Sequence, residues 1–129
     1  MKRGERGANL VEFAIVTVFI LLPLFAGIAD LGRAFYSYIG LQNASREGAR
    51  FASRAPDATA EIRAVSLQGA ASSNLDPASC TVDLDAPSHD SGQPFRVTIT
   101  CAFDWLIWPG STNLVASTEM VIFGAEDNP

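Results

Sequence analysis

The side chains that most often carry catalysis are few in this sequence and do not form a recognisable set. The single histidine, His89, lies in the segment Pro-Ser-His-Asp-Ser, without a cysteine, histidine or glutamate at the spacing of metal ligands. Ser88 and Asp90 are its immediate neighbours, whereas a catalytic triad is assembled by folding. No Gly-rich phosphate loop and no nucleophile-elbow motif is present. We therefore expect no enzymatic activity, no metal and no cofactor.

Glu12 is the ionisable residue in the most unusual setting. It is the only charge in the apolar run from Leu10 to Ala29, which is long enough to cross a bilayer as a helix of about 20 residues. A carboxylate at the edge of an apolar helix is costly unless it is paired, so it usually marks a function. The alternative is that Glu12 lies in the headgroup region, where its cost is small.

Charge is distributed unevenly on the two sides of this apolar run. Three bases and one acid precede it, whereas residues 56–129 contain two bases and ten acids. The acidic remainder argues against nucleic acid as a partner, because phosphate binding needs a basic surface. The basic start and acidic remainder fit the positive-inside rule, with residues 1–7 cytoplasmic and the rest exported.

A known processing signal is similar to the start of the apolar run and the residues just before it. Gly7 ends a short basic leader and is followed by ANLVEF, which is similar to the class III signal of prepilins. The resemblance implies that a prepilin peptidase cuts between Gly7 and Ala8 and that Glu12 sets the register between subunits. Cleavage would create an α-amine on Ala8, a cation that could pair with Glu12 of a neighbouring subunit.

Two other interpretations of the same segment stay open. In a secretory signal peptide, Pro23 would break the helix and Gly27 to Ala29 would form the cleavage site, although the apolar region is longer than usual. A plain single-span anchor would tolerate the length but would give Glu12 no role. In either membrane-spanning interpretation, Pro23 removes one backbone hydrogen bond and favours a helix kink.

The helical pattern continues beyond the membrane span. No proline occurs from Asp30 to Ser53, and one helical face carries Leu31, Phe35, Tyr38 and Ile39, followed by Gln42 and Arg46. Pro56 biases the preceding residue out of the helical conformation and so ends the run. A helix over residues 9–54 would be roughly 65–70 Å long at 1.5 Å per residue.

A second motif in this helix narrows the family. The segment LQNASREGARFA, residues 41–52, resembles the AREGAR segment of TadE-like proteins, with Ser45 in place of the first alanine. The two motifs together cover about the first 55 residues. The resemblance implies a pseudopilin or minor pilin of a tight-adherence (Tad, or Flp) pilus. Its implied partners are the prepilin peptidase, other pilin and pseudopilin subunits, the pilus assembly platform and the inner membrane.

Arg46, Glu47 and Arg50 carry the charges of this second motif. They are candidates for contact with a partner subunit or with the assembly platform at the membrane surface. The alternative is a solvated helix face with local ion pairs, of which Glu47 and Arg50 would form one. Gly48, between these charges, would let another helix approach closely.

The remainder predicts a small exported head. Residues 57–73 favour a short helix, with Asp57 as its N-cap and with Ile62, Val65 and Leu67 as its apolar positions. A turn follows over residues 74–79. Three segments then alternate apolar and polar residues, as half-buried antiparallel strands do, and they begin at Cys80, at Arg96 and at Leu114.

The two cysteines fall on facing positions of the first two predicted strands. If Val82 faces Ile99, then Cys80 faces Cys101, and both cysteines lie on the apolar face. A cross-strand disulfide is then geometrically natural and would persist in an exported compartment. Two buried free thiols are the alternative.

The most apolar loop of the head is the segment Trp105 to Trp108, which ends at Pro109 and Gly110. One interpretation is that Trp105 and Trp108 fill the core. The other is that they contact a second subunit or the membrane, because tryptophan favours interfaces.

These observations predict an α+β protein of pilin-like type. A long N-terminal helix, transmembrane over residues 10–29, packs on a small head with a short helix and a three-stranded antiparallel sheet. Residues 1–7 would form a cytoplasmic leader peptide, residues 8–54 the long helix and residues 55–129 the exported head. The other functions to weigh are a tethered adhesin-like binding module and an acidic protein secreted after release at Ala29.

Overall fold

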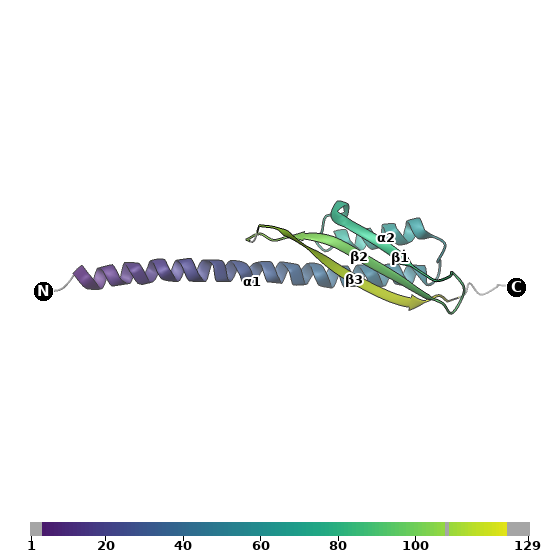
Figure 1. The fold of residues 1–129 in the computed structure, drawn as a ribbon, viewed down its shortest axis with the longest axis horizontal. Helices are drawn as coiled ribbons and strands as arrows, with labels where there is room; N and C mark the ends of the chain where they lie inside the picture. The colour runs from purple at the N-terminus through teal and green to yellow at the C-terminus, as the bar shows by residue number, and fades with distance from the viewer. Residues whose placement is uncertain (1–3, 108, 124–129) are drawn as a thin grey trace.

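The computed structural model describes residues 4–107 and 109–123, with the backbone alone for residues 4–6. Its elements in chain order are α1 (Gly4–Ala52), α2 (Thr59–Ala71), the 3-10 turn η1 (Pro77–Ser79), β1 (Cys80–Asp85), β2 (Pro94–Asp104) and β3 (Ser111–Val121). One end of α1 projects alone, and the other end lies within a small head made of α2 and the sheet (Figure 1). The expected α+β class, with a long helix, a short helix and three antiparallel strands, is confirmed.

The long helix differs from its predicted bounds at both ends. It begins at Gly4, so the last residues of the basic leader are already helical, and it ends at Ala52. The amide groups of Arg54 and Ala55 both donate to the carbonyl of Phe51, so the chain leaves the helix in a turn before Pro56. The sharp bend that Pro23 favours is absent from α1 in the view of Figure 1, and the helix continues through this proline.

The sheet has the order β1-β2-β3, with both pairs antiparallel. The predicted register holds, because Val82 faces Ile99 and Cys80 faces Cys101. The two sulfur atoms form a disulfide across β1 and β2. The alternative of two free thiols is therefore wrong for this structure.

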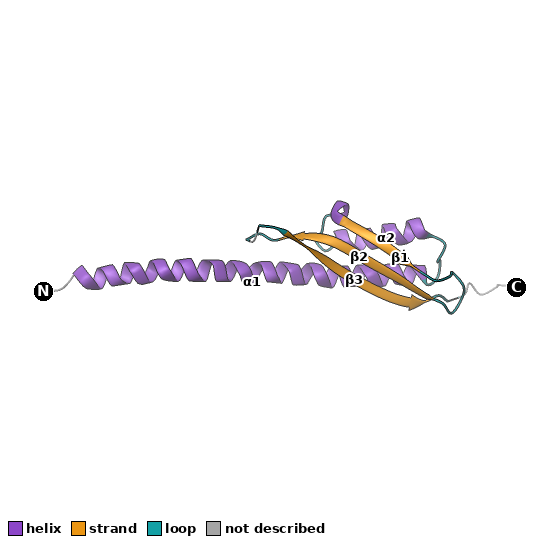
Figure 2. Ribbon diagram, viewed as in Figure 1, coloured by secondary structure: helices purple, strands orange, loops and turns teal. Residues whose placement is uncertain are grey.

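One face of the sheet packs on the second half of α1 and on α2 (Figure 2). The central strand β2 supplies every second residue to this interface, namely Phe95, Val97, Ile99, Cys101 and Phe103, all of which are buried. Alternation places these side chains on one side of the strand, so the core forms between the sheet and the helices.

The face of α1 that packs on the head is not the face that its largest apolar residues occupy. Leu31, Phe35 and Ile39 are exposed, with 65%, 64% and 46% of their surface accessible. The buried positions are mostly small and include Ala34, Ser37, Leu41, Ala44, Ser45, Gly48, Ala49 and Ala52. Small residues occupy the face of α1 that packs on the head, because they let the helix approach α2 and the sheet closely.

Glycines set the distance between α1 and α2. A Cβ atom added at Gly40 would lie 2.2 Å from the Cβ of Ser73, and one added at Gly69 would lie 2.8 Å from the Cβ of Ala44. At Gly48 an added Cβ would lie 2.2 Å from the Oγ of Ser66 in α2. The close approach that Gly48 was expected to permit is therefore used within the chain.

We predict that Gly40→Ala and Gly32→Ala have opposite effects on stability. At Gly40 the added methyl group meets a Cβ that side-chain rotation cannot move, so overpacking should lower the free energy of unfolding by about 1–3 kcal/mol. At Gly32 nothing lies within 4 Å of an added Cβ atom. The better helix propensity of alanine should therefore raise the free energy of unfolding by up to about 1 kcal/mol. Denaturant unfolding of the detergent-solubilised full chain, followed by near-ultraviolet circular dichroism, measures both. Equal effects of the two variants would contradict the proposed packing.

The short helix α2 differs from its prediction in its cap and in its buried face. Its N-cap is Ala58, and no side chain caps it. Asp57 instead places its Oδ1 atom 2.6 Å from Nδ1 of His89, a surface contact that holds the β1–β2 loop near the start of α2. The buried side chains are Ile62, Ser66 and Ala70, whereas Val65 and Leu67 are only half-buried. As in α1, close contact between the helices selects small residues for the buried positions.

Candidate functional site

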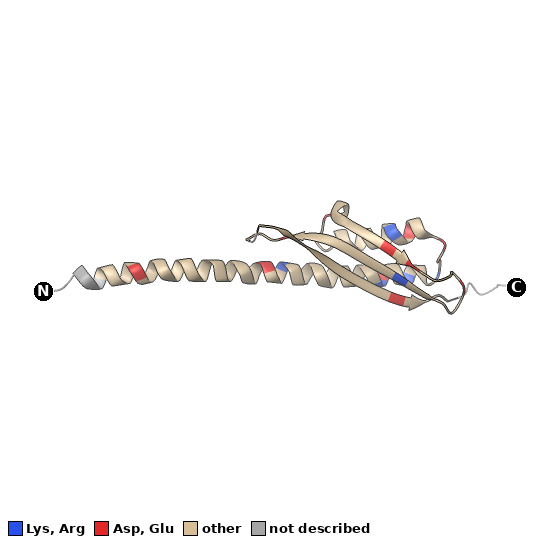
Figure 3. Cartoon of the chain, viewed as in Figure 1, with Lys and Arg blue, Asp and Glu red and all other residues tan. Residues whose placement is uncertain are grey.

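The first half of α1 is an apolar helix on which none of the other described elements packs. Every large apolar side chain from Leu10 to Ile28 is exposed, by between 41% and 76% of its surface. Within the described residues, α1 is the one helix that is long and apolar enough to cross a membrane. Figure 3 shows a long uncharged stretch between an acidic residue near its start and the charges close to the head. Exposure of this much apolar surface points to lipid or to other helices as its surroundings.

The predicted cleavage bond lies within the exposed start of α1. Gly7, Ala8, Val11 and Glu12 border the same shallow hollow, so they share one side of the helix. A Cβ atom added at Gly7 would meet nothing within 4 Å. A peptidase or another subunit can therefore reach this side without displacing any described part of the chain.

Of the three charged residues in the second motif, two pair with each other. Arg50 donates to Glu47 at 3.1 Å, and both side chains remain more than half exposed. Arg46 is exposed and forms no hydrogen bond or ion pair within the described part of the chain. These charges therefore lie on the solvent side of α1. This arrangement fits the solvated-face interpretation and leaves Arg46 accessible to a partner.

Sequence reasoning did not single out Asp30, which links the long helix to the head. Its side chain is 4% exposed, and its Oδ1 accepts a hydrogen bond from Nη1 of Arg33 at 2.7 Å. Its Oδ2 accepts the backbone N–H groups of Leu106 and Ile107 at 2.8 and 3.1 Å. The loop between β2 and β3 is thereby tied to the first charged residue after the apolar run. Its position there is the one signal in the sequence that could have drawn attention to it.

The electrostatics of Asp30 follow from these donors. Burial raises the pKa of its carboxyl group, but the hydrogen bonds from Ile107 and Leu106 and the nearby Arg33 guanidinium outweigh burial and lower the pKa overall. The carboxylate is therefore ionised at neutral pH. Arg33 also lies over the ring of Phe103, 5.2 Å from its centroid, a cation–π contact between α1 and β2.

The Trp105 side chain packs on the end of the sheet. Its ring meets Phe103 edge to face, with 5.2 Å between centroids, and its Nε1 donates to Oγ1 of Thr112 at 2.9 Å. Trp105 is half-buried, which agrees with a partly core-filling role. Leu106, by contrast, is 80% exposed. Trp108, the other predicted contact residue, lies outside the described residues.

Comparison with protein families supports the resemblance drawn from the two motifs. Residues 7–50 match the family model of the TadE-like proteins. Neither the curated proteins nor the solved structures contain a match to the chain. The matched segment begins at the predicted cleavage glycine and ends at Arg50, so it includes the first motif, the whole apolar run and residues 41–50 of the second motif. Residues 7–50 are therefore a TadE-like segment, and the family resemblance is confirmed over this part of the chain.

Proposed function

We propose that this protein is a minor pilin or pseudopilin of a tight-adherence pilus. It is inserted in the cytoplasmic membrane through residues 10–29, with its start in the cytoplasm and its head exported, and a prepilin peptidase cuts it after Gly7. The observation that carries the proposal is the helix of the TadE-like segment. Its first half is apolar and exposed among the described residues, and its second half continues into the head. A pilin subunit needs such a helix to reside in the membrane and to bundle with other subunits afterwards.

The start of the helix supports a role for Glu12 in assembly. After cleavage, the α-amine of Ala8 would lie on the same side of α1 as the Glu12 carboxylate, one turn away. Such an amine can neutralise the carboxylate of its own chain or of a neighbour. Pairing with a neighbour would set the axial register of packed helices, and it would reduce the cost of a carboxylate in an apolar environment.

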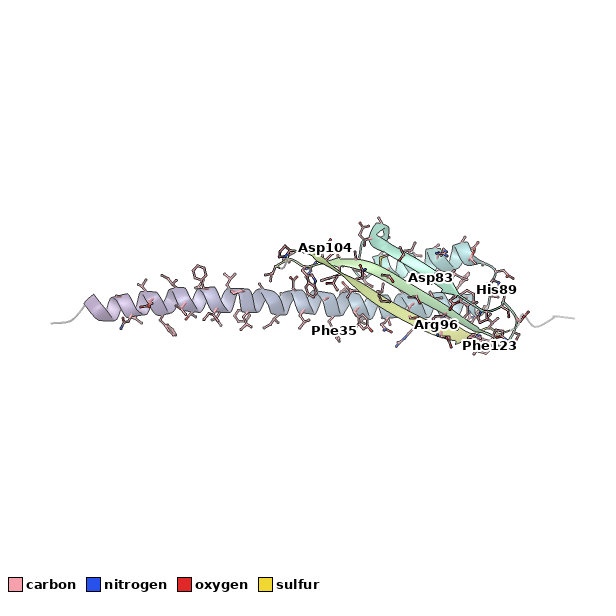
Figure 4. All side chains as sticks on the ribbon, viewed as in Figure 1. Phe35, Asp83, His89, Arg96, Asp104 and Phe123 are labelled. Carbon is pink, nitrogen blue, oxygen red and sulfur yellow. A yellow bond between two sulfur atoms is a disulfide. The ribbon has the colours of Figure 1, made fainter. Side chains whose placement is uncertain are left out.

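Two exposed surfaces of the second half of α1 are available to partners in the same scheme. One is the apolar stripe of Leu31, Phe35, Tyr38 and Ile39, which the head leaves uncovered. Figure 4 shows Phe35 on the side of α1 away from the Asp104 end of the sheet in this view. The other is the charged group of Arg46, Glu47 and Arg50. We expect the stripe to contact other subunits and the charged group to contact a subunit or the assembly platform, with surface adhesion as the outcome of the finished pilus.

N-terminal sequencing of the mature protein, purified from membranes and from sheared pili, tests this function. A first residue of Ala8 is the expected result. A first residue of Asp30 would replace the proposal by a secreted protein released after Ala29, and retention of Met1 would leave a tethered binding module. The continuity of α1 through Ala29 and the engagement of Asp30 with the head speak against cleavage at that point.

A further inference from the structure

The loop between β2 and β3 reaches the point where the apolar run of α1 ends. We define the hairpin tip as residues 105–107 and 109–110. Its backbone is bound to Asp30, the residue directly after Ala29. In Figure 1 this hairpin is the part of the head that extends furthest along α1 toward the N-terminal end. The tip therefore lies at the level of the predicted membrane boundary.

The direction of the Asp30 side chain strengthens this placement. In an α-helix each Cα–Cβ bond tilts toward the N-terminus, so a carboxylate at position 30 reaches back toward the apolar run. The run from Leu10 to Ala29 is about 30 Å long as a helix, which equals the thickness of the hydrocarbon core. The amide groups bound to Asp30 then lie at the headgroup level of the exported leaflet.

Three backbone amides of the tip and the Trp105 indole have hydrogen-bond acceptors, while apolar side chains stay outside. The amides of Leu106 and Ile107 bind Asp30, the amide of Trp105 donates to the carbonyl of Gly110, and the indole Nε1 donates to Thr112. Leu106 and Ile107 meanwhile expose 80% and 38% of their surface. Unsatisfied amide groups make a loop costly near lipid, so the pairing of these three amides lowers the cost of bringing the tip to the membrane surface.

We propose that the hairpin tip inserts Leu106 and Ile107 into the interface of the same bilayer that α1 crosses. The tip is a second membrane contact that fixes the height and the rotation of the head above the membrane. The charges that face it are Asp30, Arg33 and Asp104, of which Asp30 and Arg33 are paired and Asp104 is exposed. The Asp104 carboxylate keeps the sheet in water, so contact is confined to the headgroup region. Lipid is the occupant because the tip is tied to the end of the apolar run.

This inference rests on the membrane insertion of α1 in the proposed function but not on its role in a pilus. Both tryptophans of the chain, Trp105 and Trp108, lie in this loop. In a Trp108→Phe variant, tryptophan fluorescence therefore reports on Trp105 alone. We would reconstitute the full chain in phosphatidylcholine vesicles whose acyl chains are brominated either near the headgroup end or near the terminal methyl group.

The expected result is loss of Trp105 fluorescence in both lipids, larger with bromine near the headgroup end. A control reporter, Trp105→Phe/Trp108→Phe/Phe123→Trp, should keep its fluorescence. The amide of Phe123 binds the carbonyl of Ser53, 23 residues beyond Asp30 along α1 and so roughly 35 Å further from the membrane. Figure 4 shows Phe123 at the opposite end of the sheet from Asp104.

A pair of charge substitutions, each made in the Trp108→Phe background, separates lipid contact from a general effect on the head. Leu106→Asp should reduce the quenching of Trp105 and shift its emission to the red. Val115→Asp should leave both unchanged, because Val115 is an exposed apolar residue in the middle of β3, away from the tip.

Retention of the chain in vesicles after a carbonate wash is measured in parallel. If the chain is retained and Trp105 is not quenched, the tip proposal fails while the membrane insertion of α1 stands. A blue-shifted but unquenched emission would also overturn it, because the tip would then be covered by protein, such as a second copy. Loss of the chain in the wash would refute both the tip contact and the membrane anchor.

Discussion

Replacing Gly7 by glutamate is expected to abolish processing, so that the full-length precursor accumulates in the membrane and no pilus is assembled. The proposed peptidase must accept the residue on the N-terminal side of the cut bond, and glutamate adds both volume and charge there. Steric conflict at the point of substitution does not explain such a loss, because a Cβ atom added at Gly7 meets nothing within 4 Å. Immunoblotting for the size of the protein and electron microscopy of pili measure the two effects.

Gly4→Glu is the matched control for this variant. It adds the same charge to the same basic leader, and so changes the positive-inside signal equally, but leaves the Gly7–Ala8 bond untouched. We expect normal processing and normal piliation. Equal loss in both variants would assign the effect to membrane orientation, and unaltered piliation with Gly7→Glu would remove the proposed cleavage.

Removing the disulfide by Cys80→Ala/Cys101→Ala is expected to lower the free energy of unfolding of the head by about 3 kcal/mol. The bond closes a loop between residues 21 apart in sequence and joins β1, an edge strand, to the central strand β2. Without it the unfolded chain gains conformational entropy, and Cys101 leaves a small vacancy in the core where it is fully buried. Denaturant unfolding of the detergent-solubilised full chain measures the change.

Thr81→Ala/Thr100→Ala provides the matched control. These two residues face each other in the register next to the cysteine pair, but no covalent bond joins them. Their cross-strand contact is worth less than about 1 kcal/mol. Reductant should lower the stability of the wild-type protein nearly to that of the cysteine variant, which lacks the buried sulfur as well, and should leave the variant itself unchanged. A cysteine variant as stable as the oxidised wild-type protein would contradict this account.

The register of β1 and β2 could be predicted because antiparallel pairing leaves little freedom. Once Val82 is placed opposite Ile99, every other pair in the two strands is determined, including Cys80 with Cys101. Alternation of apolar and polar residues excludes a shift by one residue, which would turn the apolar side chains to solvent. A shift by two would keep the same faces, so the pairing of Val82 with Ile99 entered as a condition that the structure fulfils. Other local signals located the apolar run, by its length, and the helix that continues beyond it, by its helical spacing.

The buried face of α1 could not be predicted in the same way. The periodicity of Leu31, Phe35 and Ile39 correctly indicates a helix, but these residues remain exposed. Gly48 instead lies against Ser66 in α2, and Gly40 lies against Ser73, just after α2. A period identifies the faces of a helix and does not state which of them meets the head. That choice depends on how closely the neighbouring helix and sheet approach, and close approach favours small residues.

The amino-acid sequence by itself determined the elements of this protein, the likeness of residues 7–50 to TadE-like proteins and the facing cysteines. The elements and the likeness follow from local spacing or from motifs, and the facing cysteines follow from the alternation of two neighbouring strands once one pair is placed. Only the tertiary structure decided that Asp30 holds the amides of Leu106 and Ile107, which are 76 and 77 residues away. Contacts of this kind depend on the relative placement of a helix and a hairpin. No period or motif within either segment encodes that placement, so only the folded chain shows that the hairpin tip is tied to the end of the apolar run.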